Sequence, residues 1–222
     1  MNSKLSDKQK LRIQTRHRVS VERHGYQPQA LYWTNQEIQE LRFHALMGIL
    51  SDFPSTLGED ASWSMLDVGC GFADLKRYLA QHELYPDYTG IDLSPDMVRG
   101  ACAQSPDIKV YEGELSDFDY DNESFDFVML SGALNEVVET EIEGTADQQG
   151  KYARSVIYGM YQACRAGVAF NLLNKHDAHI QKRTELQSFY PEEMMTFCQG
   201  FASKVRLVEG YLDNDFTIYL YK

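Results

Sequence analysis

The chain has 222 residues, of which 43% are hydrophobic and 24% are charged, and its formal net charge is −12. This length suits one domain with a sizeable core, and the negative charge argues against broad association with nucleic acid or anionic membranes. The four cysteines lie far apart without a C-x-x-C pair, which favours reduced thiols over disulfides or a metal site. Without a signal segment or a membrane-spanning apolar run, we expect a cytoplasmic protein.

The first predicted element is a basic helix over residues 5–22, which is alternatively a partly ordered arm. Residues 1–24 contain seven Lys and Arg against two acids, so 7 − 2 gives a net charge of +5. The basic residues at 4–23 are the one feature of the chain that favours contact with nucleic-acid phosphates.

A second helix is expected after a loop at 25–33. Asn35 or Thr34 can cap it, and an apolar stripe runs from Ile38 to Leu50. We expect residues 1–60 to form an N-terminal helical appendage that acts as a cap or lid.

The most informative stretch follows an apolar strand at 64–68, which is broken by Gly69 and Gly71. Two glycines let the backbone turn sharply and lie against a ligand, and Asp67 can accept a hydrogen bond from an ammonium or a backbone amide. A dinucleotide fingerprint requires a third glycine where this chain has Asp74. An acid at that position would also face the pyrophosphate, so the loop favours a nucleoside ligand without phosphates.

A second strand over 87–91 ends in Asp92, twenty-one residues past Gly71. At about this spacing an acidic strand end reaches a ribose hydroxyl. Ser94 then caps a helix over 95–103 that begins with proline. Together with the glycine turn, Asp92 predicts a nucleoside-type cofactor.

Strands and helices alternate through most of the remaining chain, which favours a parallel sheet with helices on both faces. The expected helices are 74–82, 150–164 and 191–199, and the expected strands are 108–111, 125–131 and 167–173. The chain ends differently, in a period-two hairpin of 204–212 and 216–221 around the turn Asp213-Asn214.

Asp67, Gly69, Gly71 and Ala73, each two residues apart, resemble motif I of the class I S-adenosylmethionine-dependent methyltransferases. The resemblance implies an α/β fold over 61–222, with a Rossmann-like, seven-stranded, mostly parallel sheet and an antiparallel C-terminal hairpin strand. It implies in-line methyl transfer from S-adenosylmethionine, with S-adenosylhomocysteine as product, to a small-molecule acceptor. Methylation of tRNA or protein, and a non-catalytic S-adenosylmethionine-binding protein, remain alternatives. Acceptor atom and oligomeric state stay open.

The same resemblance implies the cofactor-binding residues. Glu114 is expected to take the adenine amino group, in place of the more common aspartate. Arg42 would clamp the cofactor's carboxylate, or lies in a surface ion pair. The complete cofactor-binding set is Asp67, Gly69, Cys70, Gly71, Asp92, Leu93, Met97, Glu114, Leu115, Ser131, Trp33 and Arg42.

Asn135 and Glu136, which follow the strand 125–131, are the candidate catalytic residues. They would orient the acceptor or take its proton, or they simply open the next helical segment. The stretch Ser131–Glu136 is not the Asn/Asp-Pro-Pro-Tyr/Phe pattern of amino methylation of bases or glutamine. His176 or His179 is an alternative base or a surface histidine. The acidic loop 139–150 gates acceptor entry or merely connects two elements; as a gate, it would favour a neutral or cationic acceptor.

Overall fold

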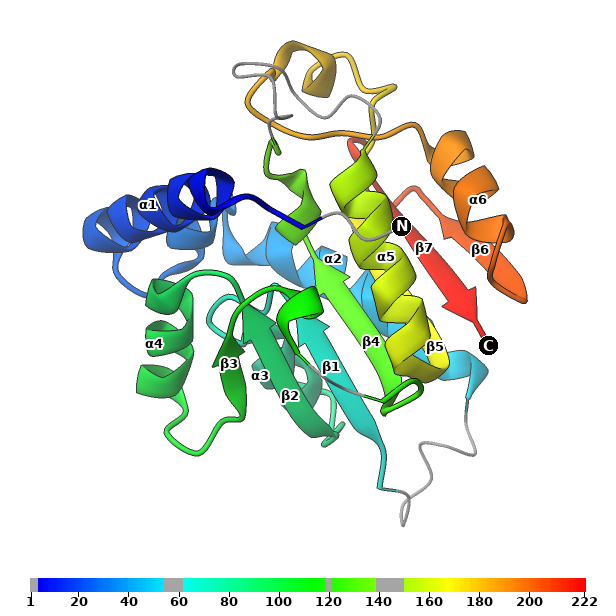
Figure 1. The fold of residues 1–222 in the computed structure, drawn as a ribbon, viewed down its shortest axis with the longest axis horizontal. Coiled ribbons are helices and arrows are strands. Elements are labelled where there is room, and N and C mark those ends of the chain that lie inside the picture. Colours follow the sequence, from blue (N-terminus) through cyan, green and yellow to red (C-terminus); the bar gives the residue numbers. More distant parts are fainter. Residues whose placement is uncertain (1–3, 54–61, 119–120, 139–149) are drawn as a thin grey trace.

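A seven-stranded sheet in the order β3-β2-β1-β4-β5-β7-β6 organises the chain (Figure 1). The structure is a computed structural model that describes residues 4–53, 62–118, 121–138 and 150–222. The strands are β1 Ser64–Val68, β2 Asp87–Asp92, β3 Val110–Glu112, β4 Phe125–Ser131, β5 Cys164–Leu173, β6 Lys204–Val208 and β7 Asp215–Tyr221. The first five pair in parallel, while β7 is antiparallel to both β5 and β6. The predicted α/β fold is confirmed.

Helices cover both faces of the sheet. They are α1 Asp7–His24, α2 Gln36–Met47, α3 Asp74–Gln81, α4 Pro95–Gln104, α5 Lys151–Ala163 and α6 Pro191–Gln199. In Figure 1, α5 and α6 lie in front of the sheet and α2 and α3 behind it. This division follows from right-handed crossovers, because β1 to β3 progress in one direction across the sheet and β4 to β5 in the other. Each face has its own hydrophobic core.

The last two strands do not follow β5 in chain order: β7 pairs with β5, and β6 lies outside it. All seven residues of β7 are buried, whereas β6 is exposed or half-buried throughout. The fully buried strand therefore lies inside the sheet, between β5 and β6, and the more exposed strand forms the edge. The predicted first hairpin strand, 204–212, is too long, since β6 ends at Val208.

One predicted connection is wrong. The helix expected over 150–164 ends at Ala163, and the strand expected at 167 already begins at Cys164, which pairs with Phe125. Cys164 is fully buried, so its apolar side chain belongs equally well to the pattern of a helix or of a strand. The pairing with β4 decides in favour of the strand.

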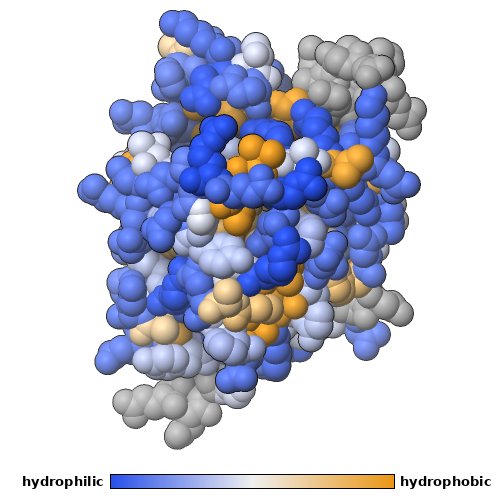
Figure 2. All heavy atoms as spheres, turned by 90° about the vertical axis from the view of Figure 1, so that its left-hand side faces the viewer, coloured by the Kyte–Doolittle hydropathy of each residue, from blue (hydrophilic) through white to orange (hydrophobic). Residues whose placement is uncertain are grey.

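Helix α1 lies across the end of the sheet to which the parallel strands point (Figure 1). Ser6 and Gln9 form a capping box at its start, Ile13 faces inward, and Leu11 is 64% exposed. The molecular face on this side is mostly hydrophilic, with small hydrophobic areas between the polar side chains (Figure 2). Of the described helices, none is long and apolar enough to cross a membrane.

Helix α2 contributes to the sheet's own core, because Phe43 and Leu46 pack with Met65 of β1 in one cluster. The predicted division into residues 1–60 and 61–222 falls within 54–61, outside the described residues. It stays a prediction.

Candidate functional site

A cavity of about 620 Å³ opens at the carboxyl ends of β1, β2, β4 and β5. It lies where the strand order reverses, between β1 and β4, which is where open α/β sheets bind ligands. Every candidate site residue from the sequence lines this cavity: Trp33, Arg42, Asp67, Gly69, Cys70, Gly71, Asp92, Leu93, Met97, Glu114, Leu115, Ser131, Asn135 and Glu136. His179 also lines it, and His176 does not.

The glycine turn after β1 has the geometry that requires glycine. Gly69 and Gly71 have φ angles of +71° and +54°, a region that other residues adopt at a cost. A Cβ atom on Gly69 would lie 2.2 Å from the Cβ of Ala133, in the loop after β4. The loops after β1 and β4 therefore meet here at a distance that excludes any side chain at position 69.

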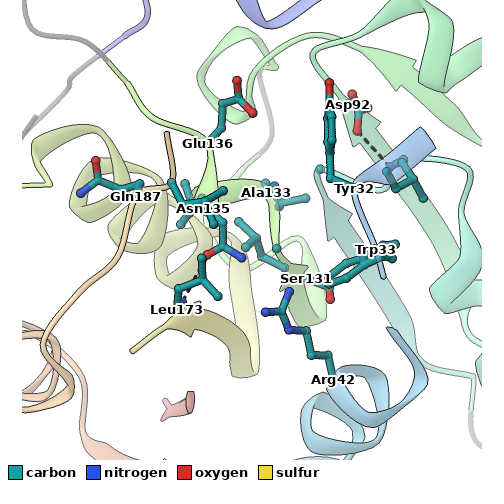
Figure 3. A pocket seen from close by; sticks show the side chains of 18 of the residues that line it. Tyr32, Trp33, Arg42, Asp92, Ser131, Ala133, Asn135, Glu136, Leu173 and Gln187 are labelled. Carbon is teal, nitrogen blue, oxygen red and sulfur yellow. Dashed lines mark hydrogen bonds between the residues drawn. The ribbon is translucent and has the colours of Figure 1, made fainter. Parts of the chain in front are cut away.

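Asp92 joins this turn to the end of β2. Its buried carboxylate accepts hydrogen bonds from the backbone N–H of Gly71 at 2.9 Å and of Ser94 at 2.8 Å (Figure 3). Burial raises the pKa of Asp92, while nearby His17 and the two hydrogen bonds oppose the shift. Each carboxylate oxygen has two lone pairs, so Asp92 retains capacity for ligand hydroxyls.

Asp67 is buried and accepts a hydrogen bond from the Tyr88 hydroxyl at 2.8 Å. Burial raises the pKa of its carboxyl from 3.8 to about 7, although the Tyr88 bond opposes this shift. Asp67 therefore exchanges a proton near neutral pH, and a cationic ligand group beside it would favour the ionised form.

We expect Asp67→Asn to stabilise the ligand-free protein at pH 8 by on the order of 3 kcal/mol, with no gain at pH 4. Between pH 4 and 7 the folded wild type keeps a proton that the unfolded chain releases, so stability falls as the pH rises. Asparagine imitates the protonated acid and removes this loss. Urea unfolding of both proteins from pH 4 to 8 measures the difference, and a gain independent of pH would contradict this explanation.

Arg42 is a buried cation, 6% exposed, and its guanidinium stacks on the Trp33 ring at 4.6 Å. Its Nε pairs with Asp215, the first residue of β7, whose other carboxylate oxygen accepts a bond from the Tyr211 hydroxyl at 3.1 Å. Burial raises the pKa of Asp215 to about 6, against the effect of Arg42. The alternative of a surface ion pair for Arg42 is wrong, because both partners are buried.

Two basic side chains of α1 bind acids at the cavity's rim. Lys10 pairs with Glu114 at 2.8 Å, the backbone N–H of Leu5 donates to Glu114 at 3.2 Å, and Arg16 pairs with Glu136. Gln14 donates to the backbone carbonyl of Leu93 at 2.9 Å. Helix α1 thus covers the cavity, and Glu114 and Glu136 hold it there.

Two asparagines fix the loop after β4 to β5. Asn171 accepts a hydrogen bond from the backbone N–H of Gly132 at 3.0 Å, and Asn135 accepts one from that of Leu173 at 3.3 Å. The loop that carries both candidate catalytic residues is therefore held on the sheet by side-chain oxygens. The predicted gate 139–150 lies outside the described residues, apart from Gly150.

Sequence reasoning missed several cavity residues. Gln39 donates to Asp74 at 2.8 Å beneath the cavity, and α1 presents Ile13, Arg16 and His17 to it. The spacing of these three α1 residues, i, i+3 and i+4, places them on one helix face. This spacing was the signal that could have found them.

Both a protein-family model and a curated relative that match this chain are described as methyltransferases. A family model described as "Methyltransferase domain" matches residues 65–150. The "Putative methyltransferase Rv1506c" of Mycobacterium tuberculosis is 32% identical over 173 residues, which cover 72% of this chain and 93% of that protein.

Solved structures show the same fold at low sequence identity. Magnesium protoporphyrin IX methyltransferase from Synechocystis, with bound S-adenosylmethionine, matches with a TM-score of 0.63 and 12% identity over 100% of both chains. The plantazolicin methyltransferase BpumL, in complex with S-adenosylhomocysteine, matches with a TM-score of 0.64 and 9% identity, covering 97% of this chain and 98% of the other.

Proposed function

We propose, from the premise that this chain belongs to the class I S-adenosylmethionine-dependent methyltransferases, that it methylates a small molecule. The observation that carries this proposal is the cavity of about 620 Å³, which α1 partly covers and whose walls include Leu134, Ile180 and Phe189. Volumes of roughly 300–1,000 Å³ are typical of small-molecule sites. The fold neighbours described above are named for magnesium protoporphyrin IX and for plantazolicin, which supports a small-molecule acceptor.

The residues present suit S-adenosylmethionine. The glycine turn leaves room for a ligand, Asp92 retains lone pairs for ribose hydroxyls, and Asp67 can pair with an ammonium. Arg42 would bind the carboxylate with its terminal nitrogens, since its Nε is already held by Asp215. Cys70, Leu93, Met97 and Leu115 would form the apolar walls of the nucleoside half. Glu114 would receive the adenine amino group while it also anchors α1.

S-adenosylmethionine supplies a methyl group on a sulfonium, an electrophile that is already activated. The chain's own contribution is therefore to hold the acceptor in line and to keep water out. Helix α1 reduces the access of water by covering part of the cavity, where its contacts with Glu114 and Glu136 hold it. The loop after β4 orients the acceptor, because Asn171 and Asn135 fix it to β5.

Methylation of a macromolecule gains no support from the basic N-terminal segment. Lys10 and Arg16 pair with acids of the chain's own rim, and Lys4 contacts Asp117 at 3.5 Å. Charges used in this way hold α1 in place and contribute less to binding phosphates.

The direct test is calorimetric titration with S-adenosylhomocysteine, and with NAD in parallel. We expect a micromolar dissociation constant for S-adenosylhomocysteine, about −8 kcal/mol, and no heat with NAD. Binding of NAD alone would contradict the interpretation of the glycine turn. Binding of neither by well-folded protein would contradict the cofactor assignment.

A further inference from the structure

The side chain of Asn135 has a fixed orientation. The backbone N–H of Leu173 donates to Oδ1 at 3.3 Å, and the backbone carbonyl of Asn135 accepts a bond from Gln187 at 2.9 Å. A backbone N–H can donate only to the oxygen of a carboxamide. This contact therefore identifies the Oδ1 atom of Asn135 and distinguishes it from Nδ2. The Nδ2 amine therefore points the other way, into the space between Asn135 and Arg42 (Figure 3).

Asn35 also lines the cavity, and its Oδ1 accepts a hydrogen bond from the backbone N–H of Ile38 at 2.9 Å, as the cap of α2. Asn35 is exposed, however, whereas Asn135 is half-buried. Asn135 is therefore the carboxamide that offers its N–H groups to the acceptor half of the cavity (Figure 3).

The carboxylates around Asn135 are engaged by arginines. Glu136 pairs with Arg16 and its side chain is 14% exposed, and Glu185 pairs with Arg183 at the outer edge. The hydrogen bond from Arg183 lowers the pKa of Glu185, which opposes its use as a base that collects a proton. The carboxylate of Glu136 is occupied by the Arg16 guanidinium. Apolar side chains fill the wall between these groups, and low polarity strengthens a hydrogen bond to an anion.

We propose that the acceptor is an organic acid, a carboxylate or an acidic phenol, and that it is methylated on the ionised oxygen that Asn135 Nδ2 binds. The acceptor's lone pair forms the new O–CH₃ bond, while the electrons of the S–CH₃ bond return to sulfur and leave a neutral thioether. No proton moves in this step. A pre-ionised nucleophile therefore agrees with the ion pairs that Glu136 and Glu185 form near Asn135. The proposal rests on the proposed function.

The first experiment measures acceptor class with radiolabelled S-adenosylmethionine and the full chain. The probes are benzoate, 4-nitrophenol and octanoate, compared with benzylamine, benzyl alcohol and octylamine. We expect labelled methyl ester or ether from the acids, at least tenfold faster than any product from the amines or the alcohol. Equal or faster labelling of an amine or the alcohol overturns the proposal, and so does the absence of product from all three acids. S-adenosylhomocysteine binding, measured in parallel, tests the proposed function separately.

The second experiment uses Asn135→Asp, which keeps an oxygen for the Leu173 N–H and replaces the amine by an anionic oxygen. We expect kcat/KM for the best acid to fall by roughly 10–100-fold, the range for loss of one hydrogen bond to a charged group, because the acceptor anion binds less tightly and meets a second anion. The dissociation constant of S-adenosylhomocysteine should change by less than about twofold, since Asn135 lies in the acceptor half.

The matched control is Asn174→Asp. Asn174 follows Leu173 at the start of the β5–α6 connection, its Oδ1 accepts a bond from the backbone N–H of His176 at 2.9 Å, and it does not line the cavity. This variant adds the same charge nearby and should retain wild-type kcat/KM. An Asn135→Asp enzyme with unchanged kcat/KM, or a loss that Asn174→Asp shares, overturns the role of Asn135.

Discussion

Arg42→Ala is expected to lower the free energy of unfolding by about 3–5 kcal/mol and to weaken S-adenosylhomocysteine binding by at least 100-fold. The variant leaves the carboxylate of Asp215 buried without its cation: it is 2% exposed and keeps only neutral donors, the Tyr211 hydroxyl and the Phe216 backbone, among the described contacts. Burial of an uncompensated charge accounts for the loss of stability. The lost carboxylate contact would account for the loss of affinity.

A double variant separates these two effects. Arg42→Met with Asp215→Leu replaces the ion pair by apolar side chains of similar size, an exchange that is often neutral or stabilising. We expect its urea midpoint to return close to the wild-type value, while S-adenosylhomocysteine binding stays weak. Wild-type affinity in this double variant would exclude Arg42 from the cofactor site.

Asp92→Ala is expected to abolish detectable S-adenosylhomocysteine binding and to destabilise the protein by about 2–5 kcal/mol, since two buried N–H groups lose their acceptor at about 1–3 kcal/mol each. Those groups belong to Gly71 and Ser94. Without the carboxylate, the turn after β1 also loses its tie to β2. Calorimetry and urea unfolding measure the two losses independently.

Asp87→Ala provides the control on the same strand. Asp87 is the first residue of β2, its side chain is 60% exposed, and it pairs with Lys109 at the end of the sheet opposite the cavity. We expect unchanged binding in this variant. Normal S-adenosylhomocysteine affinity in the Asp92→Ala protein would contradict the assignment of Asp92 to the ribose.

The sequence allowed prediction of those parts of the site that are local in the chain. The glycine turn, Asp92 and the loop after β4 each combine a strand end with its own following residues, and the parallel sheet then gathers them at one edge. Asp215 was not predictable, because nothing near it in sequence indicates a partner 173 positions away. Its role depends on the insertion of β7 beside β5, where Asp215 pairs in register with Leu173.

The charged residues of α1 show a second limit of prediction from the sequence. A run of Lys and Arg at one end of an acidic chain suggests a polyanionic partner, yet here the acids of the same chain are that partner. Glu114 and Glu136 were selected for their strand-end positions, and the sequence contains no signal that Lys10 and Arg16 reach them. Such pairs form only once the helix has docked.

The position of β7 has a consequence for how the protein is made. Strand β6 leaves the ribosome before β7, but its neighbour in the sheet is β7, so it has no strand to join when it emerges. The edge of β5 also stays unpaired until β7 is present. Arg42 likewise lacks its partner, the carboxylate of Asp215 on β7. A nascent chain therefore exposes an apolar sheet edge until β7 is synthesised, which is the stage at which aggregation competes with folding. Completion of the sheet and completion of the candidate cofactor site thus depend on the same strand.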